Sequence, residues 1–188
     1  MTPLRLGLWA LLAVAQLAAP AWMIVGQERV LRGGVQVKLH TRPVDPADFF
    51  SGRYVALGFA VEQLPRELVR GHFELEDVAY LELRDGAEGF AEAVALHKDK
   101  PAGALVLQCR VQSLSPPTVQ VELPFNRFYM DEHLAPQAER VYRAQAADPV
   151  DSFVTVRVLD GRGVIEELYL GGKPVATFLR ENQLRPEQ

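Results

Sequence analysis

The sequence predicts a mainly β domain of the α+β class behind an N-terminal transmembrane helix. We expect an antiparallel β-sandwich or barrel-like sheet with one short covering helix. Three observations support this class. Residues 6–25 contain no charge, many short segments after residue 34 have strand-like composition or alternation, and only one long stretch, residues 131–147, has helical spacing.

The uncharged stretch near the N-terminus is long enough to cross a bilayer. At about 1.5 Å per residue, a helix over residues 6–25 spans about 30 Å, which matches the hydrocarbon thickness. Trp9 and Trp22 lie toward its two ends, as interfacial aromatic residues do. The sequence therefore predicts contact with the lipid bilayer through residues 6–25.

Two other interpretations of this stretch stay open. Ala19 and Ala21 form an A-x-A pattern, as Ala13 and Ala15 do, which is typical of a cleaved secretory signal. The apolar run continues past both pairs to Val25, which favours a retained anchor. A helix buried in a soluble domain is the third interpretation.

The charge of the remaining chain limits its partners. Residues 34–188 contain 17 basic and 23 acidic side chains, for a net charge of −6. An acidic domain repels polyanions, so we expect no nucleic-acid partner. Cys109 is the single cysteine, and its apolar neighbours predict a buried structural thiol.

Residues 27–33 can continue the first helix for about two turns until the Gly33-Gly34 pair ends it. The predicted organisation is thus an anchor with a juxtamembrane helix at residues 1–33, a β-rich domain at residues 34–181 and a polar tail at residues 182–188. Strands are predicted at residues 35–40, 53–59, 78–84, around 94–96, 104–111, 118–123, 153–159 and 164–170. Asp85-Gly86 and Asp160-Gly161 indicate hairpins. Residues 63–71 are predicted to form a short helix or a loop.

A proline-rich segment leads into the second predicted strand. Pro46 restricts its own φ and the conformation of Asp45, while Asp48 can accept hydrogen bonds from nearby backbone N–H groups. Gly52 then allows a tight reversal before the strand. This pattern is turn chemistry and does not indicate catalysis.

The same segment resembles the hallmark of the GDYXXLXY family of bacterial membrane-anchored proteins, whose activity is unknown. The matching residues are Val44, Asp45, Pro46, Asp48, Gly52, Tyr54 and Leu57. Arg53 stands where the family has Asp, which reverses a charge, and Phe59 stands where it has Tyr.

The resemblance extends to an aromatic patch at residues 127–132 and to a terminal element at residues 171–175. It implies an N-terminus inside and a domain outside the cytoplasm, at the cytoplasmic (inner) membrane. It also implies a multi-spanning membrane protein as partner, and it supplies no activity.

No catalytic, cofactor or metal site is predicted. The four histidines are widely separated, and adjacent residues such as Asp131, Glu132 and His133 point in different directions on a helix. A likeness to β-rich peptidases of the signal peptidase type would require Ser51 as a nucleophile with a desolvated lysine as its base. None of the four lysines stands in a sequence context that suggests one.

Arginine and aromatic residues near the hallmark are candidates for a binding surface: Arg53, Tyr54, Arg127 and Tyr129. The alternative is that these rings belong to the core. Strand alternation places Tyr54 opposite Val55, Leu57 and Phe59, so Tyr54 is expected to be exposed if they are buried. We expect a noncatalytic accessory or interaction module of a bacterial envelope complex, and the alternative is a cell-envelope hydrolase or peptidase.

Overall fold

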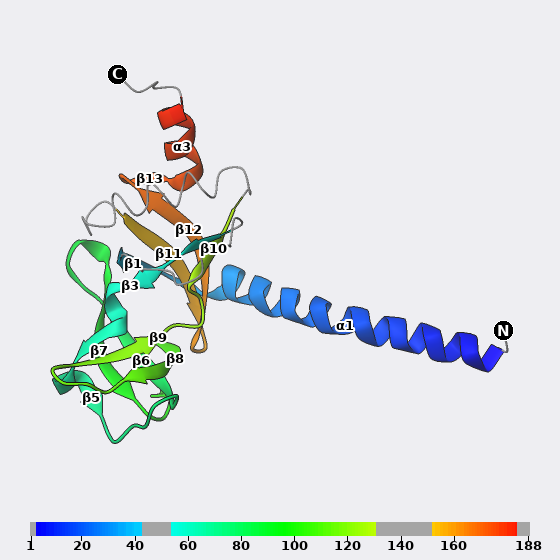
Figure 1. The fold of residues 1–188 in the computed structure, drawn as a ribbon, viewed down its shortest axis with the longest axis horizontal. Helices are drawn as coiled ribbons and strands as arrows, with labels where there is room; N and C mark the ends of the chain where they lie inside the picture. Colours follow the sequence, from blue (N-terminus) through cyan, green and yellow to red (C-terminus); the bar gives the residue numbers. More distant parts are fainter. Residues whose placement is uncertain (1–2, 43–53, 131–151, 184–188) are drawn as a thin grey trace.

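A computed structural model describes residues 3–42, 54–130 and 152–183 of the chain (Figure 1). It consists of a long N-terminal helix, α1 (Pro3–Gly33), that projects away from a β-rich domain, with the N-terminus at its far end. The predicted mainly β class is confirmed.

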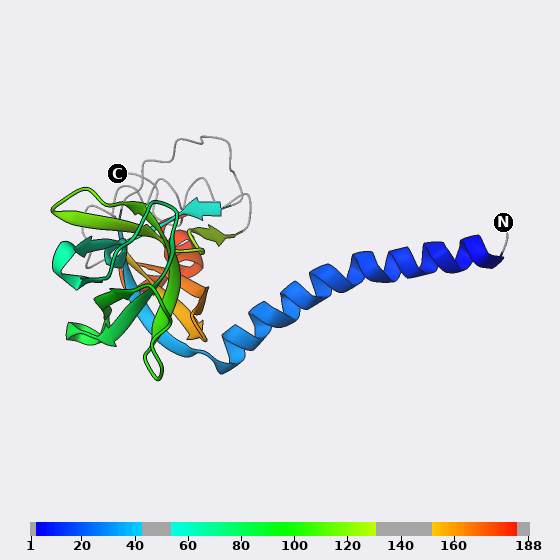
Figure 2. The same ribbon diagram turned by 90° about the horizontal axis from the view of Figure 1, so that it is seen from below.

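Helix α1 continues through residues 27–33 and ends at Gly33, as the Gly33-Gly34 pair predicted. Pro20 lies inside the helix, which is gently curved in Figure 2. By length and composition, the 23 residues Leu11–Gly33 could cross a membrane, and no part of their most apolar window is buried in the structure. The interpretation as a buried helix of a soluble domain is therefore wrong, whereas an anchor and a signal sequence both meet this description.

Thirteen strands lie in the described part of the chain. They are β1 (Val35–Arg42), β2 (Tyr54–Ala56), β3 (Gly58–Phe59), β4 (Gln63–Pro65), β5 (Val69–Arg70), β6 (Val78–Asp85), β7 (Ala91–His97), β8 (Val106–Ser113), β9 (Thr118–Glu122), β10 (Arg127–Tyr129), β11 (Ser152–Leu159), β12 (Arg162–Leu170) and β13 (Lys173–Pro174). One sheet has the order β13-β12-β11-β1-β3, a second has the order β4-β9-β8-β6-β7-β5, and β10 pairs with β2.

The sheets curve around a shared core into a nearly closed, barrel-like arrangement (Figure 2). A parallel bridge between Leu107 and Gly161 links the two larger sheets, and the Gln108 N–H donates to the Gly161 carbonyl at 2.7 Å. Leu39, Phe59 and Leu81 from different strands are fully buried in one cluster.

Local sequence rules explain several elements. In β1, Val37 and Leu39 are buried while Lys38 between them is exposed, which is the predicted alternation. Asp160 and Gly161 have φ values of 54° and 87°, the left-handed conformation that a two-residue turn of type I′ requires between β11 and β12. This hairpin was predicted from the Asp-Gly pair.

Other elements differ from the prediction. Residues 63–71 form β4, a short 3₁₀ turn η2 (Arg66–Leu68) and β5, because pairing with β9 and β7 overrides the weak local signal. Two more 3₁₀ turns are η1 (Ala60–Glu62) and η3 (Ala87–Gly89). The helix predicted at residues 131–147 lies outside the described residues.

The C-terminal helix α3 (Val175–Gln183) was not predicted. Pro174 directly precedes its first turn, and Val175 and Leu179, four residues apart, are both buried. Residues 182 and 183 belong to α3, although the polar tail was predicted to begin at residue 182.

Candidate functional site

The candidate site is a small two-stranded ribbon made by β2 and β10. The strands are antiparallel, with Tyr54 opposite Tyr129 and Ala56 opposite Arg127. Side chains at alternate positions share one face of a strand, so Tyr54, Arg127 and Tyr129 lie on the same face. The Arg127 guanidinium carbon is 4.8 Å from the centre of the Tyr54 ring, and the two tyrosine rings meet edge-on at 5.6 Å.

This face of the ribbon is accessible. Tyr129 is 66% exposed, Arg127 is exposed and Tyr54 is half-buried, whereas Val55 on the opposite face is fully buried. The cation over the Tyr54 ring contributes about 0.5–1 kcal/mol at such an exposed position. The three side chains therefore form a preorganised Arg–Tyr–Tyr cluster rather than independent surface residues.

Three contacts attach the ribbon to the core. The Leu57 N–H donates to the Asn126 carbonyl at 2.9 Å, which extends the pairing beyond β2 and β10. The Phe59 and Phe125 rings pack with centroids 5.6 Å apart. The third contact is the carboxylate of Glu62.

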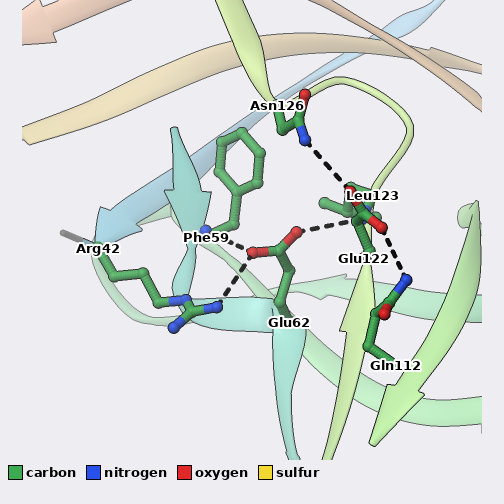
Figure 3. Close-up of polar contacts among 7 residues, drawn as sticks. All are labelled: Arg42, Phe59, Glu62, Gln112, Glu122, Leu123 and Asn126. Atoms are coloured by element: carbon green, nitrogen blue, oxygen red, sulfur yellow. Dashed lines mark hydrogen bonds and ion pairs between the residues drawn. The ribbon is translucent and has the colours of Figure 1, made fainter. Parts of the chain in front are cut away.

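Glu62 is a buried acidic residue that joins the two segments leading to the ribbon (Figure 3). Its Oε2 accepts a hydrogen bond from the Phe59 N–H at 2.9 Å, and its Oε1 accepts one from the Leu123 N–H at 3.1 Å. An Arg42 Nη2 lies 3.6 Å from Oε2. Burial raises the pKa of Glu62, and the two backbone hydrogen bonds and Arg42 oppose that shift.

A second carboxylate, that of the exposed residue Glu122, lies next to this region (Figure 3). Glu122 accepts hydrogen bonds from Gln112 Nε2 at 2.8 Å and from Asn126 Nδ2 at 3.2 Å. Asn126 thus contacts β9 through its side chain and the hallmark segment through its carbonyl. These contacts place the start of β10 next to the end of β2.

The structure brings together three of the four predicted binding residues: Tyr54, Arg127 and Tyr129. Arg53 lies outside the described residues, as do the hallmark residues Asp45, Pro46, Asp48 and Gly52. Leu57 is 2% exposed and Phe59 is fully buried, so these two serve the core. Phe59 is therefore a core residue and does not belong to the exposed face that carries Tyr54.

Sequence reasoning missed Glu62 and a row of rings. Glu62 directly follows the uncharged run of residues 54–61, which is a signal that could have identified it. The rings of Tyr169, Phe153, Phe90 and His40 contact one another in that order, with Lys38 Nζ 5.8 Å from the Phe153 centroid. These residues come from separate strands and a loop, so no local pattern could have shown the row.

The described residues hold no group of three or more His, Cys, Asp or Glu side chains that could bind a metal ion. His97 pairs with Glu82, with Nε2 and Oε2 2.7 Å apart. Cys109 is buried as predicted, and burial raises the pKa of its thiol to about 12. All four lysines are exposed, so none offers a buried base for a hydrolase, and Ser51 lies outside the described residues.

A family model, described as GDYXXLXY protein, matches residues 16–168. The chain belongs to the GDYXXLXY family. The match includes both strands of the ribbon and the second half of α1, so the ribbon lies within the family's shared region. Searches of the curated proteins and of the solved structures found no match.

Proposed function

We propose that this protein is a noncatalytic accessory module, anchored in the cytoplasmic membrane by α1, whose domain outside the cytoplasm binds a protein of the same membrane. The observation that carries the proposal is the Arg–Tyr–Tyr cluster of Tyr54, Arg127 and Tyr129. Arginine and tyrosine are the residue types that most often dominate binding energy at protein interfaces. Here they are held together on an exposed face.

The mechanism is positional. An anchored domain and a partner in the same bilayer meet at a high effective concentration, so a contact of modest area suffices. A rigid ribbon also loses little conformational entropy on binding, because packing and Glu62 already order it. The partner that fits is a multi-spanning membrane protein with a surface outside the bilayer.

Crosslinked pulldown of the full-length protein from native membranes tests this proposal. We expect Tyr54→Ala and Arg127→Ala each to lower partner recovery about tenfold, the effect of about 1.4 kcal/mol of binding energy. Arg127→Lys should also lower recovery, because an ammonium lacks the planar group that stacks on the ring.

Leu75→Ala is the matched control, since Leu75 is 62% exposed and lies between β5 and β6, outside both strands of the ribbon. Its recovery should equal that of the wild type. Equal recovery in every variant would remove the ribbon from the binding surface. A wild-type protein found only as an isolated monomer in mild detergent would contradict the accessory role itself.

A further inference from the structure

The end of α1 is seated directly on β11. A Cβ added to Gly34 would lie 3.0 Å from the Val158 nitrogen and 3.1 Å from its carbonyl oxygen, so the two backbones touch. Arg157 Nη1 donates to the Gly34 carbonyl at 3.4 Å. The domain end of α1 is therefore packed against β11.

This attachment places the β11–β12 turn beside the last turns of α1. Figures 1 and 2 both show the start of β12 next to the domain end of the helix. The Arg162 guanidinium lies 3.9 Å from the position of a Cβ on Gly26, the residue that follows the uncharged run. If α1 spans the bilayer, the turn sits within about 12 Å of the hydrocarbon edge, because eight helical residues rise about 12 Å.

A cleft of about 410 Å³ opens at the same turn. Its lining includes the loop after β7, with the small residues Ala102, Gly103 and Ala104, and also Val158, whose backbone lies close to Gly34. The cleft therefore adjoins the end of α1 through Val158.

The cleft has one cation and one anion at its rim. Lys100 Nζ lies 3.5 Å from Asp160 Oδ1, and both side chains are exposed. An exposed ion pair contributes little to stability, so each member can exchange its partner for a ligand at little cost. Two opposite charges beside a loop of small residues match a headgroup that has both a phosphate and an ammonium group.

We propose that this cleft binds the headgroup of a zwitterionic phospholipid with a primary ammonium, taken from the membrane that holds α1. Lys100 contacts the phosphate, Asp160 accepts hydrogen bonds from the ammonium, and the glycerol portion lies on the small residues of the loop. This inference rests on the proposed membrane attachment. The headgroup site would be a second contact with the membrane, in addition to α1, and would set the orientation of the domain relative to the bilayer.

The test uses the full chain reconstituted in nanodiscs of phosphatidylethanolamine and phosphatidylglycerol, with retained lipid measured after extraction into mild detergent. We expect the wild type to retain phosphatidylethanolamine preferentially. Lys100→Ala and Asp160→Asn should each lower that retention at least about fivefold, since each removes one of two charges that contact the headgroup. Asn adopts the left-handed conformation of residue 160 readily, so this variant keeps the turn.

Lys98→Ala is the matched control, because Lys98 is exposed nearby and pairs with Asp77 outside the cleft. It should leave retention unchanged. A fluorophore at Ala102→Cys should be quenched by headgroup nitroxide lipids, and one at Glu181→Cys on α3 should not be.

Equal retention of both lipids by the wild type would overturn the headgroup site while leaving the anchor intact. Unchanged retention in Lys100→Ala or in Asp160→Asn would overturn it as well. A chain that does not enter nanodiscs at all would instead overturn the membrane attachment, and with it this inference. The partner pulldown does not depend on either residue, so the two proposals fail separately.

Discussion

Glu62 shows how one buried charge can position an exposed surface. Each of its two oxygens accepts a hydrogen bond from a backbone N–H group next to the ribbon. One belongs to Phe59, which follows β2, and the other to Leu123, which precedes β10. Unpaired, either N–H would be a buried donor without an acceptor, which costs about 1–3 kcal/mol. The Arg–Tyr–Tyr cluster therefore depends on a carboxylate that does not belong to it.

We predict that Glu62→Gln destabilises the domain by about 1–3 kcal/mol, because the amide NH₂ would face one of the two backbone donors. Glu122→Gln is the matched control: its carboxylate is exposed and bonded only to side chains, so its loss should cost about 0.5 kcal/mol or less. Denaturant unfolding followed by circular dichroism measures both. Equal costs would show that the two backbone contacts of Glu62 do not matter.

Comparison of the wild type with Glu62→Gln also tests how stability depends on pH. Burial raises the pKa of folded Glu62 above its ordinary 4.5, so the folded state binds a proton before the unfolded state does. The free energy of unfolding contributed by this group therefore rises as the pH falls through the folded pKa, and it levels off below 4.5. Gln cannot take up a proton, so the stability gap between wild type and Glu62→Gln should widen over that range. A constant gap would contradict a raised pKa.

Single residues were predictable where burial decides their role. The apolar neighbours of Cys109 predicted its burial, and strand alternation predicted that Tyr54 would face away from Val55 and Leu57. The partners of Glu62 were not predictable, because Leu123 is 61 residues away in the sequence. Only the fold brings that N–H to the carboxylate.

At the scale of elements, the junction between α1 and β11 depends on close backbone packing at Gly34. Gly34 follows the last helical residue, its N–H donates to the Val30 carbonyl at 2.8 Å, and Val30 is itself buried. The Gly33-Gly34 pair predicted where the helix ends. It did not predict that Gly34 would be packed against Val158, because this requirement arises from the partner strand.

We predict that Gly34→Ala destabilises the domain by about 1–3 kcal/mol, since the new methyl group would lie 2.6 Å from the Val30 oxygen and must displace backbone. Gly26→Ala is the matched control. Its methyl group would meet only Arg162 at 3.9 Å, so stability should be unchanged or slightly higher. Thermal unfolding of the full chain in mild detergent compares them, and equal melting temperatures would show that the junction is loose.

Elements defined by their own sequence were predicted well, and elements defined by their neighbours were not. The Asp160-Gly161 hairpin has a local requirement for positive φ that the sequence displays. Strands β4 and β5 have 3 and 2 residues and exist only through pairing, so residues 63–71 carried no clear signal. Helix α3 was not predicted because it is only 9 residues long and the burial of Val175 and Leu179 depends on packing against β12.

At the scale of the whole molecule, the structure is a β-rich domain that packs against the end of an exposed apolar helix. The side chains of Trp22 and Val25 are 82% and 64% exposed. Leaving such a surface in water is unfavourable by about 25 cal/mol for each Å² of apolar area, so a bilayer around the helix would stabilise it. The family match from residue 16 includes the second half of this helix, and the packing of Gly34 against Val158 joins the helix to the domain.

We predict that the mature protein keeps residues 6–25 and stays in the membrane pellet after alkaline carbonate extraction, because 20 uncharged and mostly apolar residues bind a bilayer far more strongly than a surface contact does. Replacing Leu12 and Leu17, both exposed on α1, with Arg should release the chain, since a charge near the centre of a spanning helix costs about 2.5–3.5 kcal/mol. Replacing Val35 and Leu75, which are exposed on the domain, with Arg is the control and should leave the protein in the pellet. N-terminal sequencing of the extracted protein separates the alternatives: a mature chain that begins near Trp22 and washes out with carbonate would establish a cleaved signal, and the domain would then act without a tether.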